Sequence, residues 1–89
     1  MRTAREKLLD NGIDNEEMLL IDDDAFCESL IGTTDDERAV YDYNMMVDEF
    51  SKYHGCSTED AADYINFNVL RALPYYGNQA PIVVFTMLE

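Results

Sequence analysis

The chain has 89 residues, which is enough for one domain with a single modest core. Hydrophobic residues make up 47% of the chain and aromatic residues 11%, a composition that excludes an acidic disordered tail. Six Lys and Arg against 19 Asp and Glu give a formal net charge of −13, so we expect no direct binding to nucleic acid or to an anionic membrane. The charge favours a basic protein as partner.

The negative charge is concentrated in the first part of the chain. Every Asp and Glu except the terminal Glu89 precedes Tyr64, and no Lys or Arg lies between Leu8 and Glu37. Residues 64–88 contain a single charged side chain, that of Arg71, and much of the β-branched and aromatic content. The sequence therefore predicts an acidic first part that packs on a hydrophobic second part.

Two features of the sequence indicate a cytoplasmic protein. Cys27 and Cys56 are too few for a disulfide framework, so we expect both thiols to be free in a reducing compartment. The basic start of the chain is followed by only two leucines before Asp10, which is far short of the apolar stretch of a signal peptide. The longest apolar run, near residues 82–85, is too short to cross a membrane.

The first predicted element is a helix. Thr3 and Glu6 have the spacing of a capping box, in which the hydroxyl and the carboxylate each accept from a backbone N–H at the helix start. Gly12 is expected to end this helix, because glycine readily adopts the left-handed conformation of a helix terminus. The short apolar run at residues 18–21 is predicted to be a strand.

A hairpin and a second helix follow. Residues 30–34 and 38–43 flank three consecutive acids, and the second of these segments alternates with a period of two, as a hairpin strand does. Asn44 is expected to cap a helix that Gly55 closes.

The remainder of the chain is predicted to form a third helix and a last strand. The helix should begin at Ser57 and end before Pro74, which restricts the preceding residue. Residues 75–78 are expected to form a turn. Residues 82–88 carry apolar side chains on both alternating faces, so we expect a strand inside the sheet, covered on both sides. The predicted fold is a single α+β domain over residues 1–89 in the order α-β-β-β-α-α-β, with a mostly antiparallel sheet packed by helices.

Three sequence stretches carry a resemblance to known proteins: RAVYDY at 38–43, NFNVLRALPYYG at 66–77 and APIVVF at 80–85. In their spacing the chain resembles a family of small acidic proteins, largely without assigned function, from bacterial phages and mobile elements. The resemblance implies a fold and a mobile-element context, in which proteins often bind and block host defence or regulatory machinery. It implies no catalytic residue.

The sequence contains residues suited to metal binding and to thiol chemistry. Asp22, Asp23 and Asp24 offer oxygen ligands for Ca²⁺ or Mg²⁺, but the ordered ligand spacing of a calcium loop is absent, so we favour a solvated acidic loop and expect no metal or other cofactor. His54 and Cys56 could form a base and nucleophile pair. The surrounding negative charge opposes the thiolate, so catalysis is disfavoured.

Polar residues interrupt the hydrophobic second part at Tyr64, Asn66, Asn68 and Arg71. They either form a binding face or satisfy buried groups, and for Arg71 we expect a carboxylate partner from the first part of the chain.

The favoured function is that of a non-enzymatic interaction protein whose acidic surface binds and blocks a basic protein, such as a nucleic-acid-binding component of host defence. Such a surface could imitate the dense charge of nucleic acid. A structural or homo-oligomeric module stays open as an alternative, and a small metal-dependent or thiol enzyme is a less favoured one. The residues predicted to contact the partner are Asp22, Asp23, Asp24, Glu28, Asp35, Asp36, Glu37, Tyr75 and Tyr76.

Overall fold

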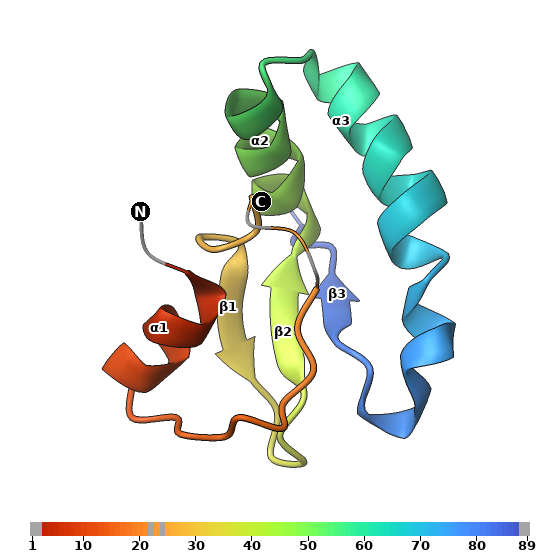
Figure 1. Cartoon of the computed structure of the whole chain (residues 1–89). Helices are drawn as coiled ribbons and strands as arrows, with labels where there is room; N and C mark the ends of the chain where they lie inside the picture. The colour runs from red at the N-terminus through yellow and green to blue at the C-terminus, as the bar shows by residue number, and fades with distance from the viewer. Residues whose placement is uncertain (1–2, 22, 24, 88–89) are drawn as a thin grey trace.

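The computed structural model describes residues 3–21, 23 and 25–87, in which helices pack against a three-stranded mixed sheet (Figure 1). This arrangement confirms the α+β class. The helices are α1 (Ala4–Asp10), α2 (Tyr43–His54) and α3 (Thr58–Tyr64), continued by the π-helix η1 (Ile65–Leu70) and the 3₁₀-helix η2 (Leu73–Gln79), and the strands are β1 (Leu30–Thr33), β2 (Ala39–Asp42) and β3 (Ile82–Val84).

The sheet has the order β1-β2-β3 and differs from the expected one in three respects. The β1–β2 hairpin is antiparallel as predicted, whereas β3 runs parallel to β2. No strand forms at residues 18–21. The last strand ends at Val84 and lies at the edge of the sheet among the described strands, so the prediction that it lies inside the sheet is wrong.

Local sequence signals set most helix ends. The Thr3 capping box is present, and the N–H of Ile13 donates to the carbonyl of Leu8 at 2.9 Å beyond the end of α1. The start of α2 differs from the prediction, because β2 runs directly into the helix and its last residue, Asp42, acts as the cap. The Asp42 carboxylate accepts from the N–H of Met45 at 3.0 Å.

The third helical segment is longer and less regular than expected. Ser57 caps α3 as predicted, but the backbone continues through the π-turns of η1 instead of a regular α-helix. Pro74 lies in the first turn of η2, where its missing N–H costs nothing. The predicted turn at residues 75–78 lies within η2, where Gly77, with a φ of 85° and a ψ of −157°, makes a kink between two helical turns.

The hydrophobic core covers one face of the sheet. Ala39 and Tyr41 of β2 are fully buried on this face, and buried side chains of α1, α2, α3 and η1 pack with them. Side chains alternate between the two faces of a strand, and Val83 is paired with Tyr41, so Val83 also points into the core. The opposite face carries Val40, Ile82 and Val84, which are only half-buried and lie outside the core cluster. We call these three residues, with Phe85 that follows them, the open face.

Residues 11–29 form no helix or strand within their described part, yet they supply core side chains such as Met18, Ile21 and Phe26. The hydroxyl oxygen of Tyr41 accepts from the N–H of Ile21 at 3.2 Å and so joins this segment to the central strand. Burial raises the pKa of Tyr41 to about 12.

Candidate functional site

Three consecutive acids form the tip of the β1–β2 hairpin. Asp35, Asp36 and Glu37 are all exposed, as the sequence predicts. The Thr34 hydroxyl donates to the Asp36 carboxylate, and the N–H of Thr34 donates to the carbonyl of Arg38 at 2.9 Å, so the tip has a defined shape. Glu37 has a φ of 63°, an unusual conformation for a residue with a side chain. A charged residue is therefore present at a position where glycine or asparagine would be easier to accommodate.

The loop before Met18 brings a further acid to this tip. A hollow of about 230 Å³ is lined by Glu17, Asp36 and Glu37 together with the polar or apolar side chains of Asn15, Met18 and Gln79. We call Glu17, Asp35, Asp36 and Glu37 the hairpin pole. Its residues come from two segments that are about 20 positions apart in the sequence, and the fold brings them together.

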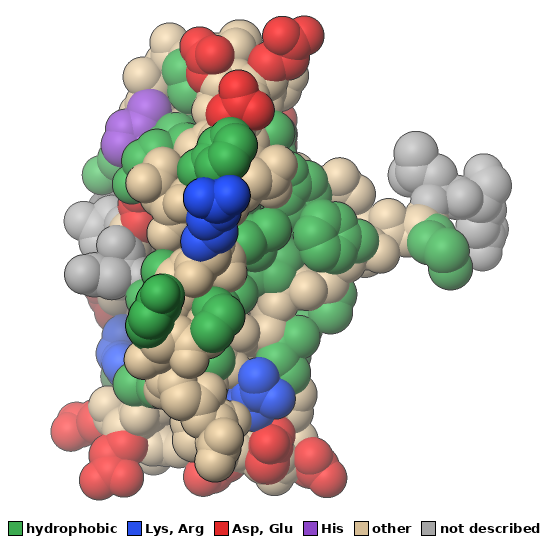
Figure 2. All heavy atoms as spheres, turned by 90° about the vertical axis from the view of Figure 1, so that its right-hand side faces the viewer, with side chains coloured by type: hydrophobic (Ala, Val, Ile, Leu, Met, Phe, Trp, Pro, Cys, Tyr) green, Lys and Arg blue, Asp and Glu red, His purple; other side chains and the backbone are tan. Residues whose placement is uncertain are grey.

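A second group of acids lies at the start of α3, where Glu59, Asp60 and Asp63 are exposed. Figure 2 shows acidic side chains at the top and at the bottom of the molecule, with few between them on this face. We call Glu59, Asp60 and Asp63 the helix pole. On this face the acidic side chains are thus divided between two separate ends.

Two acids that were predicted to contact a partner are engaged within the protein. Asp23 accepts from the N–H of Ala25 at 2.9 Å, and its carboxylate lies 3.9 Å from Nε2 of His54. Glu28 is exposed, but its carboxylate lies 3.9 Å from Nζ of Lys7. Asp22 and Asp24 lie outside the described residues.

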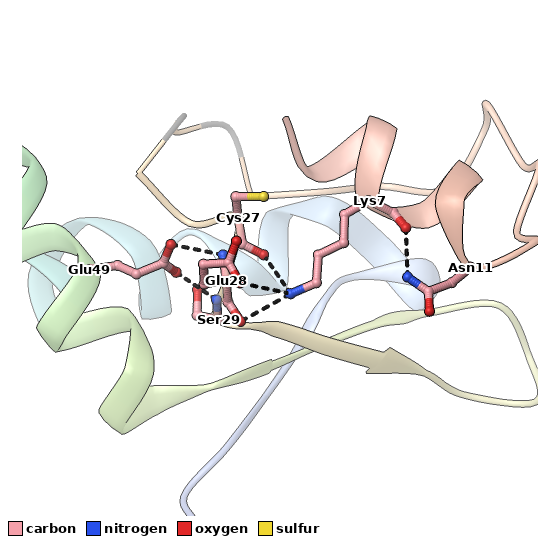
Figure 3. Close-up of polar contacts among 6 residues, drawn as sticks. All are labelled: Lys7, Asn11, Cys27, Glu28, Ser29 and Glu49. Atoms are coloured by element: carbon pink, nitrogen blue, oxygen red, sulfur yellow. Dashed lines mark hydrogen bonds and ion pairs between the residues drawn. The ribbon is translucent and has the colours of Figure 1, made fainter. Parts of the chain in front are cut away.

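The backbone around Glu28 is held by side chains from two helices (Figure 3). The Glu49 carboxylate of α2 accepts from the N–H groups of Glu28, at 2.8 Å, and of Ser29. Nζ of Lys7 donates to the carbonyls of Cys27 and Glu28 at 3.1 and 3.2 Å. This arrangement fixes the chain just before β1, and sequence inspection did not reveal it because the partners lie about 20 residues apart.

Three cations of the first half, Arg5, Lys7 and Arg38, bind backbone carbonyls. Arg5 donates to the carbonyls of Asn15 and Met18 at 2.9 and 3.1 Å, and Arg38 donates to the carbonyl of Ala80 at 2.8 Å. Like Lys7, these side chains hold loops in place. Their charge is directed onto the protein's own backbone, while the carboxylates of the hairpin pole face solvent.

The polar residues of the hydrophobic half lie on the surface. Arg71 is exposed with its guanidinium carbon 4.9 Å from the ring centre of Phe67, so the expected partner of Arg71 is replaced by an aromatic ring. Asn66 accepts from the Tyr43 hydroxyl at 3.1 Å, and Asn68 donates to the carbonyl of its neighbour one turn earlier. Of the predicted tyrosine pair, Tyr75 is 91% exposed and Tyr76 is half-buried.

The structure offers little for the metal and thiol alternatives. No group of three or more His, Cys, Asp or Glu side chains within the described residues is placed to hold a metal ion. His54 packs against the rings of Phe50 and Tyr53, with centroid distances of 4.2 and 5.0 Å. Both thiols are free, with Cys27 buried and Cys56 half-buried.

The open face is a feature that sequence reasoning missed. Phe85 is 61% exposed, and its ring lies on that of Tyr43 with a centroid distance of 4.6 Å. Thr86 accepts from the Asn44 side chain at 3.3 Å, and Met87 is 93% exposed. Figure 2 shows a hydrophobic area on the side of the molecule from which this C-terminal segment projects. The two-sided apolar pattern of residues 82–85 was the available signal, but it was interpreted as burial on both sides.

Comparison of the chain with family models, with curated proteins and with solved structures gives no match. Among the described residues, no helix is long and apolar enough to span a membrane.

Proposed function

We propose that this protein is a non-enzymatic interaction protein whose hairpin pole docks onto a basic surface of another protein. The observation that carries the proposal is the opposite placement of the two kinds of charge. Arg5, Lys7 and Arg38 donate to backbone carbonyls, whereas Asp35, Asp36 and Glu37 project from the hairpin tip into solvent.

The physical consequence is a negative field that a basic partner senses before contact. Oppositely charged surfaces accelerate encounter, and this effect weakens as salt shortens the screening length from about 30 Å at 0.01 M to about 8 Å at physiological ionic strength. The net charge of −13 opposes folding through self-repulsion, so a benefit in binding would explain why it is kept.

The shape of the hairpin pole narrows the kind of docking. Acids that imitate a nucleic-acid backbone would be expected at regular spacing along a strand, but Asp35, Asp36 and Glu37 lie in the loop that joins β1 to β2. This placement favours a compact acidic projection that enters a basic pocket or groove. The partner class we propose is a basic protein, including nucleic-acid-binding proteins of host defence, in keeping with the phage and mobile-element resemblance.

The test compares two variants that remove the same charge from different ends. The hairpin variant carries Asp35→Asn, Asp36→Asn and Glu37→Asn, and the control carries Glu59→Gln, Asp60→Asn and Asp63→Asn. Each protein is immobilised, partners are captured from a bacterial lysate at low and at physiological salt, and association rates are measured for each basic protein identified.

The hairpin variant should lose at least about tenfold in association rate with that partner, while the control loses much less, because encounter depends on charge close to the contact. Equal losses in both variants would indicate a general effect of net charge, and unchanged binding of the hairpin variant would refute the proposal. The hairpin variant should also be more stable to heat, since Asn tolerates the left-handed conformation of Glu37 and repulsion at the tip is relieved.

A further inference from the structure

The sheet has a second surface whose properties differ from those of the acidic poles. Val40, Ile82 and Val84 point away from the core, and Phe85 continues the same apolar area toward the C-terminal segment. Asp42 also belongs to this side of β2 by alternation, but it is 4% exposed and caps α2. The described part of this surface therefore presents no exposed carboxylate from its strands.

This apolar surface lies between the two acidic poles. In Figure 2 the hydrophobic area occupies the middle of the molecule on the side of the projecting C-terminal segment, and acidic side chains gather above and below it. The molecule measures 34 × 30 × 28 Å along its principal axes, so a 20-residue helix, about 30 Å long, matches its size.

We propose that the open face is the docking seat of an amphipathic helix of the partner, with apolar residues at its centre and Lys or Arg at both ends. The apolar stripe of the helix would cover Val40, Ile82, Val84 and Phe85, and its cationic ends would reach the hairpin pole and the helix pole. The inference rests on the proposed function and adds the secondary structure and the charge pattern of the segment that binds.

Charge decides between this occupant and a second copy of the chain. Two copies would each contribute a net charge of −13, and face-to-face packing would bring acidic poles near acidic poles. The open face is also small, because it involves only the two short strands β2 and β3, whereas stable interfaces bury about 800 Å² on each partner. The apolar contact area alone is too small for tight binding. A helix with basic ends gains additional binding energy from its electrostatic attraction to the two acidic poles.

The edge strand β3 has few of the features that usually prevent an edge strand from pairing with other chains. Edge strands in stable monomers are usually protected by charges or irregularities, yet β3 carries only Ile and Val, with Pro81 before it. Apart from the buried Asp42, the described residues of the open face and of β3 carry no acidic side chain, and Arg38 binds the carbonyl of Ala80 just before β3. Apolar surfaces that are rimmed by polar residues mark interaction sites.

The experiment uses the full chain and a synthetic peptide of about 20 residues, with a Leu and Ala stripe in its centre and Lys at both ends. A second peptide of the same composition, with its order scrambled so that no stripe forms, is the control. Binding is followed by NMR titration of the isotope-labelled protein, and the amide shifts locate the peptide. We expect saturable shifts of Val40, Ile82, Val84 and Phe85 with the striped peptide only.

Two variants test the seat without disturbing the core. Val84→Thr conserves shape and strand propensity, and Phe85→Ala removes an exposed ring, so the two together should weaken peptide binding at least about tenfold. Phe67→Ala, which removes another exposed ring of 59% exposure on η1, is the matched control and should have no effect. Unchanged binding of the double variant or equal binding of the scrambled peptide would overturn the inference. Shifts confined to the hollow that Leu8 of α1 and Leu30 and Ile31 of β1 line would also overturn it.

Sedimentation of the unmodified protein addresses the second copy. A dimer that Phe85→Ala converts to a monomer would assign the open face to self-association and overturn the inference. The outcomes also separate the two proposals. If the hairpin variant loses its basic partner while Val84→Thr with Phe85→Ala leaves peptide binding intact, the proposed function stands and only the helix seat fails. If the hairpin variant keeps its partner, the proposed function fails.

Discussion

The backbone of residues 11–29 is held differently from that of residues 39–70, although both segments contribute side chains to the same core. In residues 39–70, apart from the short connection at 55–57, the chain is helical or pairs in the sheet, so its own hydrogen bonds satisfy most of the backbone. In residues 11–29 side chains from elsewhere bind the backbone, as Arg5, Lys7, Glu49 and Tyr41 show.

The difference has an energetic meaning. A hydrogen bond to a charged group contributes about 1.5–3 kcal/mol and a neutral one about 1 kcal/mol, so four or five such contacts can replace a missing ladder. Each contact can nevertheless open without the others, whereas helical turns form and melt cooperatively. We therefore expect residues 11–29 to open locally at lower cost than the helices, and amide hydrogen exchange should show this gradient.

The largest loss of stability is expected when a side chain that contacts both segments is removed. Phe50 is 6% exposed and contacts Phe26 of the irregular segment and Tyr64 of α3, with centroid distances of 5.9 and 4.5 Å. Phe50→Ala should cost about 3–5 kcal/mol of unfolding free energy, measured by urea denaturation. Amide protection should fall in both segments together. Loss of protection in one segment alone would contradict a shared core.

A second change concerns the contact between Tyr41 and Ile21. The pKa of Tyr41 is raised from 10.0 to about 12 in the folded protein, so the unfolded chain loses the phenol proton first as pH rises. Stability from this group is complete below pH 10 and is lost between pH 10 and 12, a difference of about 3 kcal/mol. Urea denaturation across this pH range should show a steeper decline for the unmodified protein than for Tyr41→Phe. Identical slopes would show that Tyr41 is not protected from ionisation.

The smallest effect is expected for a variant that weakens one side-chain contact to the backbone of residues 11–29 and leaves the helices and the sheet unchanged. Glu49→Gln keeps the size of the side chain but replaces one accepting oxygen by an NH₂ group, which faces the N–H of Glu28 or Ser29. The expected cost is about 1–3 kcal/mol, with faster exchange of these two amides. The adjacent Asp48→Asn is the control, because Asp48 makes only a surface pair with Lys52 one turn away, worth about 0.5 kcal/mol. Equal costs for the two variants would argue against the backbone contact.

What the sequence predicted correctly depends on neighbours within a few positions. The Thr3 capping box, the Ser57 cap, the Gly55 helix end and the antiparallel hairpin all follow from local chemistry. The start of α2 was misplaced by two residues because a strand that continues directly into a helix leaves its last residue, Asp42, as the cap.

The position of β3 could not be obtained in this way. An apolar pattern on both faces of a strand fits a covered central strand and an uncovered edge strand equally well, and only the parallel pairing with β2 decides between them. The same limit applies to the site. The exposure of Asp35–Glu37 follows from a hairpin loop, whereas the engagement of Asp23 and Glu28 depends on His54 and Lys7, which are distant in sequence.

The pairing of β3 with β2 has a consequence for the order in which the chain can fold. Val40 pairs with Ile82, and Arg38 reaches Ala80 across 42 positions, so these contacts close one of the longest loops in the molecule. The hairpin and the helices need only nearby residues, and non-local pairings form slowly because loop closure must come first. During synthesis β3 leaves the ribosome after β2, because Ile82 follows its partner Val40 by 42 positions. Until then the edge of β2 that β3 later covers is free, and a ribosome-bound chain is at that stage most prone to pair with another strand.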